Sequence, residues 1–316
     1  MSRPFKLASL NRSISQPVVN GPASGNIVPT TGSPWVERFL MLHRRVRDAV
    51  MISGRAGVGA RNAKGDDVKL FDLAANGAAL DVLRELRQPL IVDSEESGRQ
   101  KIGSGTPRHR LVLDPVDGSD NWARGLPFSV LSCAVLPVDA PLHPDWVEAA
   151  LVGPLDQEIP LIALKGSGGW EGNDRLETSQ VRNTTEAMIS VELNHHSPSP
   201  GLARLLAAAR GVRCYGCASR ALSLVAEGAT DAHVDVRGRL TAESYLAAAR
   251  LVIEAGGWVA GLDGAPLTVI APLAAAQPLA TIVLATVLLK ERLTLAQGAG
   301  VGLTVTAVMA LSVLVA

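Results

Sequence analysis

Apolar positions along the chain fall into two patterns that alternate with each other. Five stretches place apolar residues three or four positions apart, which predicts amphipathic helices: 35–51, 72–86, 202–209, 218–227 and 245–255. Between them lie short, nearly continuous apolar runs, as in buried strands: 89–92, 111–113, 128–137, 146–153, 188–193 and 231–236. This alternation predicts layered α/β packing rather than a helix bundle or a sandwich.

The two ends of the chain depart from this pattern. Residues 1–34 are rich in Ser, Pro, Asn and Gly and lack an apolar signal-peptide core, so we expect a disordered N-terminal tail. Residues 264–289 and 293–316 contain no charged residue, and only the segment 290–292 separates them. Each uncharged run is long enough to cross a lipid bilayer as a helix.

Composition narrows the class of protein. The 316 residues include 30 basic and 30 acidic side chains, so there is no basic excess for binding nucleic acid. Three cysteines do not form a disulfide framework, and they predict a reducing, cytoplasmic setting. Cys214 and Cys217 have the spacing of a metal or redox pair, but no second pair completes a zinc site. His195 and His196 should point to opposite sides of an extended segment, so one shared ion is not expected.

The strongest candidate chemistry lies in the stretch 113–122, which reads Leu-Asp-Pro-Val-Asp-Gly-Ser-Asp-Asn-Trp. Asp114 and Asp117 stand three residues apart on a tight turn after an apolar run. Pro115 and Gly118 make such a turn rigid. Clusters of oxygen ligands suit a hard cation such as Mg²⁺. The alternative is an ordinary Asp/Gly/Pro surface turn.

Two further acidic pairs follow predicted elements: Asp67 with Asp72, and Glu95 with Glu96. If loops bring all the pairs to one cleft, cations must neutralise them, because neighbouring carboxylates repel one another. Two cations can activate a water and stabilise the leaving oxygen of a phosphoryl transfer, and the Ser119 hydroxyl could orient that water. Taken singly, each pair is better explained as solvated loop charge.

Five segments, in this order along the chain, resemble signatures of the inositol monophosphatase family. They are 67–72, 94–97 (the GEES metal loop), 114–122 (DPxDG[ST]xN and an aromatic), 216–219 (Gly-[ST]-Ala-Ala) and 254–264 (EAGG with a later DG). The match covers 35–267, which we take as an inositol monophosphatase-like domain. The resemblance implies a layered α/β (αβαβα) sugar-phosphatase fold and, commonly, a homodimer.

The resemblance also implies an activity: Mg²⁺-dependent hydrolysis of a phosphate monoester, inositol monophosphate or a similar sugar phosphate, by metal-activated water. The implied metal ligands are Glu95, Asp114, Asp117 and the carbonyl of Val116. The implied catalytic residues are Glu95 and Ser119, which orient the water, with Asp72 in support. The implied substrate-binding residues are Gly118 and Ser119 for phosphate, and Gly216, Cys217 and Ala218 for substrate hydroxyls.

The chain departs from the family pattern at two places. An Asp ten residues before Glu254 would supply a ligand to the second metal, and that position here is Ser244, a weak neutral ligand. Glu243 could replace the Asp only if the loop shifted by one residue. Arg220 would face a second substrate phosphate or, as we favour, lie on a solvated helix face. Ser244 therefore leaves a second hypothesis open, a non-catalytic member that binds metal and phosphoester.

The C-terminus has two interpretations. In the family a last strand and helix follow the Asp-Gly turn, and residues 280–297 could supply them. Alternatively, 267–289 and 293–316 form a membrane hairpin, since 277–298 resembles the last two helices of EamA-type drug/metabolite transporters. We favour the hairpin, an apolar helical tail that predicts membrane contact through 268–316 and a membrane-tethered family member. Two helices cannot form a transport path, so transport is not predicted.

Overall fold

The computed structural model describes residues 33–54, 57–61, 67–194, 196–238 and 240–261. Its helices are α1 (Pro34–Ser53), α2 (Leu70–Glu85), α3 (Ser119–Arg124), α4 (Pro200–Ala208), α5 (Ala218–Ala226) and α6 (Ala242–Glu254), with 3-10 turns η1 (Pro144–Trp146) and η2 (Thr184–Glu186). The N-terminal tail, the closing Asp-Gly turn and the predicted C-terminal hairpin lie outside the described residues.

The strands form an eight-stranded sheet, a three-stranded sheet and an antiparallel pair, β1 with β2. The eight-stranded sheet has the order β10-β9-β8-β7-β6-β5-β3-β4, and the three-stranded parallel sheet has the order β12-β11-β13. The strands are β1 (Gly57–Arg61), β2 (Asp67–Lys69), β3 (Leu90–Ser94), β4 (Gly98–Ile102), β5 (His109–Asp117), β6 (Val130–Pro137), β7 (Ala149–Pro154), β8 (Leu161–Leu164), β9 (Gly168–Glu171), β10 (Asp174–Arg175), β11 (Met188–Glu192), β12 (Gly211–Arg213) and β13 (Ala232–Asp235).

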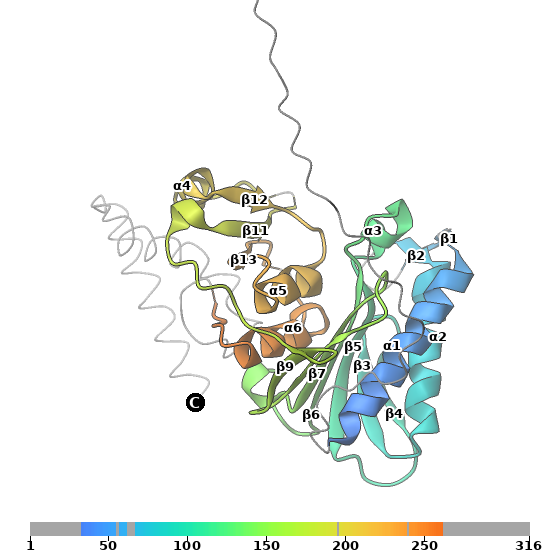
Figure 1. The fold of residues 1–316 in the computed structure, drawn as a ribbon. Coiled ribbons are helices and arrows are strands. Elements are labelled where there is room, and N and C mark those ends of the chain that lie inside the picture. The colour runs from blue at the N-terminus through green and yellow to red at the C-terminus, as the bar shows by residue number, and fades with distance from the viewer. Residues whose placement is uncertain (1–32, 55–56, 62–66, 195, 239, 262–316) are drawn as a thin grey trace, which may run out of the picture.

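The elements stack in layers, as the sequence pattern predicts. Helices α1 and α2 cover one face of the large sheet, while α5 and α6 lie between its other face and the small sheet (Figure 1). Helix α4 lies next to the small sheet, at the end of the molecule away from the large one (Figure 1). This arrangement confirms a mixed α/β fold with helices on both faces of a central sheet.

The alternation of side chains along the central strands builds both cores. In β5, Leu111 and Leu113 belong to the core beneath α1 and α2, whereas Val112 belongs to the core beneath α6. Successive residues of a strand point to opposite faces, so a strand that is apolar at every position must be covered on both sides. By the same alternation, Asp114, the residue after Leu113, lies on the face of the sheet that α6 covers.

Helix α6 begins earlier than the sequence pattern predicts. It starts at Ala242 rather than Tyr245, with Thr241 as its N-cap residue. Its apolar periodicity becomes evident only at Tyr245, because Glu243 and Ser244 in the first turn are polar. Glu243 and Ser244 are therefore helical residues of the first turn, not loop residues.

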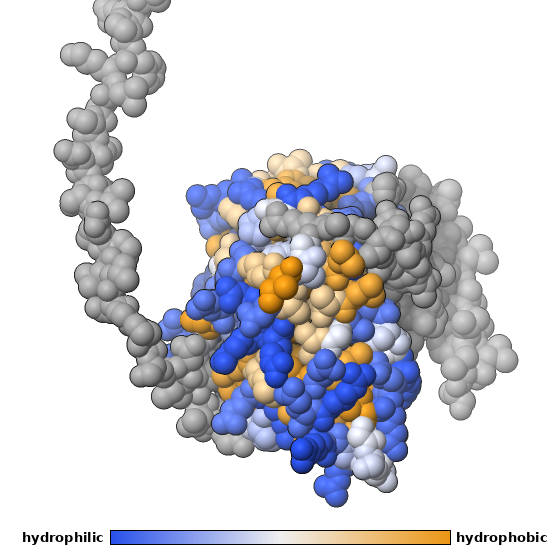
Figure 2. Space-filling model, turned by 90° about the vertical axis from the view of Figure 1, so that its right-hand side faces the viewer, coloured by the Kyte–Doolittle hydropathy of each residue, from blue (hydrophilic) through white to orange (hydrophobic). Residues whose placement is uncertain are grey.

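Within the described residues, no helix combines the length and apolarity needed to cross a membrane. Figure 2 views the side that carries α1 and α2, where hydrophobic residues lie in small patches among hydrophilic ones. Four exposed apolar side chains come from the end of α1 and the start of α2: Met51, Ile52, Leu70 and Leu73. The homodimer stays a prediction.

Candidate active site

The Asp-Pro-Val-Asp-Gly stretch forms the end of β5 and the turn into α3. Gly118 has a φ of 82°, and a Cβ there would lie 2.6 Å from the Phe128 carbonyl oxygen and 2.9 Å from Cys217 Cβ. Glycine meets both demands, the left-handed backbone and the close approach. The Asn121 amide donates to the carbonyl oxygens of Phe128 (3.0 Å) and Tyr215 (2.6 Å). The segment before α5 is thereby held against the start of α3.

Glu95 and Asp114 lie at the same end of two neighbouring strands. The Glu95 amide donates to the Leu113 carbonyl oxygen at 3.0 Å, which fixes Glu95 beside the residue that precedes Asp114. Asp114 is buried, and one of its carboxylate oxygens accepts the Val116 N–H at 3.0 Å. Glu95 is half-buried. Two of the predicted metal ligands therefore stand on adjacent strands at one edge of the large sheet.

Asp117 is held from the opposite side by α5. The Ser219 N–H donates to the Asp117 carboxylate at 2.7 Å, and the Cys217 thiol donates to the Asp117 carbonyl oxygen at 3.4 Å. The Ser219 hydroxyl donates to the carbonyl oxygen of Ser244 at 2.8 Å. Ser219 thus bridges the Asp117 carboxylate and the backbone of Ser244, which places the start of α6 beside Asp117.

Glu243 is tied to the same edge of the sheet through its backbone. Its carbonyl oxygen accepts the Ser132 hydroxyl at 2.9 Å, and Ser132 pairs with Asp114 across β5 and β6. The Ser244 hydroxyl lies 3.3 Å from the Thr241 hydroxyl in the first turn of α6. Both candidates for the missing ligand therefore lie at the N-terminus of α6, beside the predicted metal ligands.

The carboxylates of the cluster act on one another electrostatically. The pKa of Asp72 is raised to about 7, first by burial and then by the charges of Glu96 and Glu95, against the lowering effect of Lys69. Burial also raises the pKa of Asp117, with Glu95 adding to the rise and hydrogen bonds from Ser219 opposing it. Asp72, Glu95 and Asp117 come from distant parts of the sequence, so the fold does gather these acidic groups.

The chemistry of these donors fits a hard divalent cation. All of the predicted ligands are oxygens, and Asp72 has a buried carboxylate oxygen without a hydrogen-bond partner. Within the described residues, however, no three His, Cys, Asp or Glu side chains lie close enough to hold an ion as they stand. The carboxylates would have to move together by side-chain rotation to share a metal. The side chain of Asp67 lies outside the described residues.

The raised pKa of Asp72 leads to a prediction about stability. Because the folded-state pKa exceeds the value of about 3.9 in an unfolded chain, the folded state binds this proton more tightly, and stability falls as pH rises from about 4 to about 7. We expect Asp72→Asn, measured by urea unfolding in EDTA, to raise the free energy of unfolding by about 1 kcal/mol at about pH 4.5 and about 4 kcal/mol at about pH 8.

The matched control for this prediction is Asp81→Asn, on the solvent side of the same helix. Its side chain is 65% exposed and pairs with Arg84. We expect this change to alter stability by less than about 1 kcal/mol at either pH. Equal stability gains at the two pH values for Asp72→Asn would contradict the assigned titration.

Arg220 does not lie where the sequence suggested. We expected a solvated helix face or, as the alternative, a contact to a second phosphate. The side chain is instead buried and bonds to Glu227 (2.5 Å) and Ser223 (2.9 Å), near the other end of α5. A buried arginine needs a carboxylate partner, and Glu227 supplies it. Arg220 therefore stabilises α5.

The other histidine and cysteine candidates are accounted for by local contacts. Exposed His196 contacts only the backbone carbonyls of the preceding turn, and His195 lies outside the described residues. Both cysteines of the CxxC segment are free thiols. Cys214 Sγ lies 3.5 Å from the Glu192 carboxylate, whereas Cys217 contacts the backbone of Asp117. Their partners differ, so the pair is explained without a metal or a disulfide.

Sequence reasoning missed two residues at the edge of the small sheet, Glu192 and Asp235. Glu192 is fully buried and accepts the amides of Tyr215 (3.1 Å) and Gly216 (2.7 Å), which fixes the predicted substrate-binding turn. Asp235 is its register partner on β13 and pairs with Arg237. A signal was present, because both acids lie one residue before the end of a predicted strand, and the carboxyl ends of parallel strands meet at one edge where ligands commonly bind.

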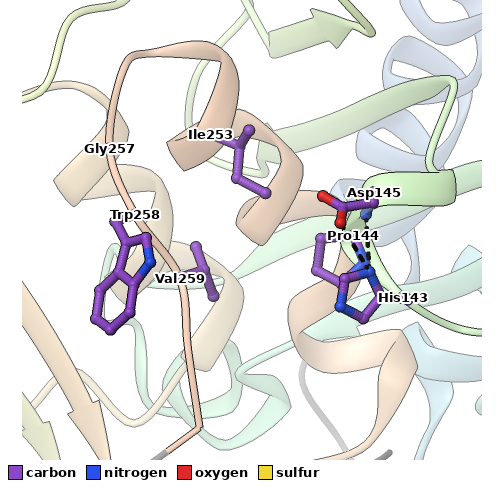
Figure 3. Close-up of a pocket in the computed structure, with 7 residues that line it drawn as sticks. All are labelled: His143, Pro144, Asp145, Ile253, Gly257, Trp258 and Val259. Carbon is purple, nitrogen blue, oxygen red and sulfur yellow. Dashed lines mark hydrogen bonds and ion pairs between the residues drawn. The ribbon is translucent and has the colours of Figure 1, made fainter. Parts of the chain in front are cut away.

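A pocket of about 250 Å³ lies elsewhere, between η1 and the end of α6 (Figure 3). It is lined by His143, Pro144, Asp145, Ile253, Gly257, Trp258 and Val259. In Figure 3 the His143 ring lies beside Asp145, to which the dashed lines run, while Trp258 lies across the opening from them. None of the predicted site residues lines this pocket, so it is separate from the acidic cluster.

Comparison with known proteins agrees with the fold. The fructose-1,6-bisphosphatase/inositol-1-monophosphatase of Methanothermobacter thermautotrophicus is 29% identical over 213 residues, covering 64% of this chain and 74% of that protein. Inositol monophosphatase 1 of Bos taurus is 22% identical over 240 residues, covering 69% of this chain and 83% of that protein. The crystal structure of the extragenic suppressor protein suhB from Bartonella henselae matches with a TM-score of 0.63 at 24% identity, covering 74% of this chain and 89% of that one.

The family model described as "Inositol monophosphatase family" matches residues 44–295. This match runs through the first uncharged stretch, 264–289, and nothing in the comparisons supports a resemblance of the C-terminus to EamA-type transporters, so we no longer hold that interpretation. Membrane contact through 268–316 is likewise unsupported. The family match covers well over half of the chain, and the curated relatives agree with it. The chain therefore belongs to the inositol monophosphatase family, in which the relatives named inositol monophosphatase and fructose-1,6-bisphosphatase are phosphoric monoester hydrolases.

Proposed function

We propose that this protein hydrolyses a phosphate monoester, inositol monophosphate or a similar sugar phosphate, with Mg²⁺ as its metal. The observation that carries the proposal is the gathering of carboxylates from α2, the β3–β4 turn and β5: besides burial, Glu96 and Glu95 raise the pKa of Asp72, and Glu95 raises that of Asp117. Such a cluster favours a bound cation, because the cation removes the mutual repulsion. Family membership supports the reaction class, and an all-oxygen donor set supports Mg²⁺.

The proposed metal ligands are the carboxylates of Glu95, Asp114 and Asp117 and the carbonyl oxygen of Val116. A bound Mg²⁺ would act as a Lewis acid on the phosphoryl group and would lower the pKa of a water molecule. The backbone hydrogen bonds described above hold these ligands in place. Asp114 and Val116 are buried, whereas Glu95 and Asp117 are half-buried, so the cluster is open to a substrate on one side and screened from water on the other.

In this proposal the chain's own groups direct the attack. The Ser119 hydroxyl and the Glu95 carboxylate orient the water in line with the leaving group, and Asp72 supports them from α2. The N–H groups of Gly118 and Ser119 bind the phosphate, since the turn into α3 presents backbone donors. Catalysis then comes from positioning and from neutralising charge, without a covalent intermediate.

The substrate class follows from the relatives and from the small sheet. Relatives are named for fructose 1,6-bisphosphate, inositol 1-phosphate and NADP. In this chain Gly216, Cys217 and Ala218 are proposed to contact the hydroxyls of the substrate. Glu192 fixes this turn through two backbone amides, which supports a rigid binding surface. A polyol phosphate fits a surface of backbone and small side-chain groups.

The test is phosphate release by the purified full-length chain. With Mg²⁺ we expect turnover of inositol 1-phosphate or fructose 1,6-bisphosphate, and no turnover after EDTA, with recovery when Mg²⁺ is restored. A panel of sugar and nucleotide phosphates would then rank the substrates. No release from any member of the panel at millimolar Mg²⁺ would refute the proposed activity.

One observation favours a second candidate function. Ser244 lies where Ser219 links α6 to Asp117, and a serine there contributes no negative charge to a second metal. A chain impaired in this way could still bind metal and phosphoester without hydrolysis. The two functions are separated by restoring the carboxylate at position 244.

A further inference from the structure

Lys69 is a cation in direct contact with the Ser119 hydroxyl, one of the proposed water-orienting groups. It ends β2 and is the N-cap residue of α2, 50 positions before Ser119 in the sequence. Its ammonium nitrogen lies 2.9 Å from the Ser119 hydroxyl oxygen and 2.8 Å from an Asp120 carboxylate oxygen. The lysine side chain is only 12% exposed, whereas that of Asp120 is 85% exposed. A surface ion pair with Asp120 alone does not require so buried a lysine.

The contact with Ser119 has a defined direction. An ammonium group has only donors, so Lys69 must donate, and the Ser119 oxygen must accept with one lone pair. The hydroxyl keeps one lone pair and one proton for other partners. A serine hydroxyl otherwise rotates freely, and this bond therefore reduces its orientations before any substrate binds.

Neighbouring groups hold the ammonium group of Lys69 in a fixed position. The Phe71 ring centroid lies 5.9 Å from the ammonium, and Asp72 is close enough for the lysine charge to act on it. The backbone of Lys69 belongs to the β2–α2 junction, which leaves the side chain to reach across to α3. A fixed ammonium at this point is a pre-organised charge, which needs no rearrangement during reaction.

We propose that Lys69 is a positioning residue that fixes the Ser119 hydroxyl, so that its free lone pair and its proton face the attacking water and the phosphate. This inference rests on the proposed function of Ser119. It assigns the lysine a role through Ser119 rather than as a metal ligand or a general base.

The test is a double-mutant cycle in the full-length chain, with Lys69→Met, Ser119→Ala and both changes together. We expect Lys69→Met to lower kcat by about 10- to 30-fold and to raise KM by only about threefold, because the Ser119 hydroxyl then loses its orientation toward the attacking water and, to a smaller extent, its contact with the phosphate. In the Ser119→Ala background the same lysine change should lower kcat by less than about twofold. Lys69→Arg should recover part of the loss, since it retains a charged donor.

Lys165→Met is the matched control. This lysine also lies over an aromatic ring, that of Trp146 at 5.9 Å, and donates to a backbone carbonyl, but it contacts no site residue. We expect its kcat to equal that of the unchanged chain. Thermal unfolding of every variant shows whether a loss of rate reflects a loss of fold.

Two results would overturn the inference: an unchanged kcat in Lys69→Met, or an equal loss in both backgrounds. If the chain hydrolyses no phosphate ester, the proposed function is refuted. The affinity of the same four proteins for inorganic phosphate is then measured by calorimetry in the presence of Mg²⁺. There we expect Lys69→Met to weaken binding at least threefold, and not in the Ser119→Ala background. Equal weakening in both backgrounds, or none, overturns the role of Lys69 independently of catalysis.

Discussion

Asp114→Asn should lower kcat by about 10³-fold or more at saturating substrate and Mg²⁺. Asparagine keeps the shape of the side chain and can still accept the Val116 N–H, so the turn at the end of β5 should be preserved. What is lost is one negative charge on a proposed metal ligand. A 10³-fold loss corresponds to about 4 kcal/mol of transition-state stabilisation, within the range expected when a metal that polarises a phosphoryl group is displaced.

The same substitution has a second measurement that does not depend on turnover. A ligand that binds only the folded state raises its melting temperature, and we expect Mg²⁺ to do so for the unchanged chain. For Asp114→Asn this rise should largely disappear, while the protein in EDTA should melt at the same or a higher temperature, because a repelling charge has been removed. Asp81→Asn controls for the chemistry of the change at an exposed site. A variant that keeps both full activity and the Mg²⁺ shift would exclude Asp114 as a ligand.

Strands β3, β5, β6 and β7 of the large sheet and the helices beside it could be predicted, because their apolar positions follow a short-range period, whereas β8, β9 and β10 were not predicted. Leu111 and Leu113 face one core and Val112 the other, so an uninterrupted apolar run correctly indicated a strand covered on both faces. The first helix was predicted from residue 35 and begins at Pro34, where the Ser33 side chain accepts the amide of Trp35. Helix α3 and strand β4 were missed, because short polar segments carry no apolar period.

Contacts within one motif of the site could be predicted from the sequence, whereas contacts between residues far apart in the chain could not. The turn at Gly118 and the carboxylates flanking it are one continuous motif, so their proximity is a property of the local sequence. Lys69 reaches Ser119 across 50 positions, and nothing in the residues around the lysine indicates that contact. The helix that carries Arg220 was predicted, but the direction of the Arg220 side chain was not, because it depends on the ion pair with Glu227. Side-chain direction is decided by packing partners, which periodicity does not specify.

The interpretation of position 244 depends both on the local sequence and on long-range contacts. The sequence shows only that a serine stands ten residues before Glu254, whereas the fold shows that this serine is one hydrogen-bonded residue away from Asp117. Its place in the first turn of α6 also matters, because a negative charge there interacts favourably with the N-terminus of a helix. A carboxylate at position 244 would therefore be electrostatically favourable in this fold, although the chain has a serine there.

Ser244→Asp should therefore raise Mg²⁺ affinity and kcat/KM together, by about 10- to 100-fold when Mg²⁺ is limiting. The added carboxylate is a far better ligand for Mg²⁺ than a neutral hydroxyl. Helix α6 should not be weakened, since Asp is favoured in the first helical turn. The rise is measured as the Mg²⁺ concentration that gives half-maximal phosphate release, and separately by calorimetric titration of Mg²⁺.

Two companion variants decide what a gain or its absence means. Ser244→Asn adds an oxygen of the same reach without charge, and we expect it to leave Mg²⁺ affinity within about threefold of the unchanged chain. Glu243→Gln removes the only neighbouring carboxylate in the first turn of α6. If Ser244→Asp has no effect and Glu243→Gln abolishes activity, Glu243 already supplies the ligand, and the chain has moved the charge by one residue along the helix. If Ser244→Asp alone converts an inactive chain into a phosphatase, the natural serine holds this family member in a binding rather than a catalytic role.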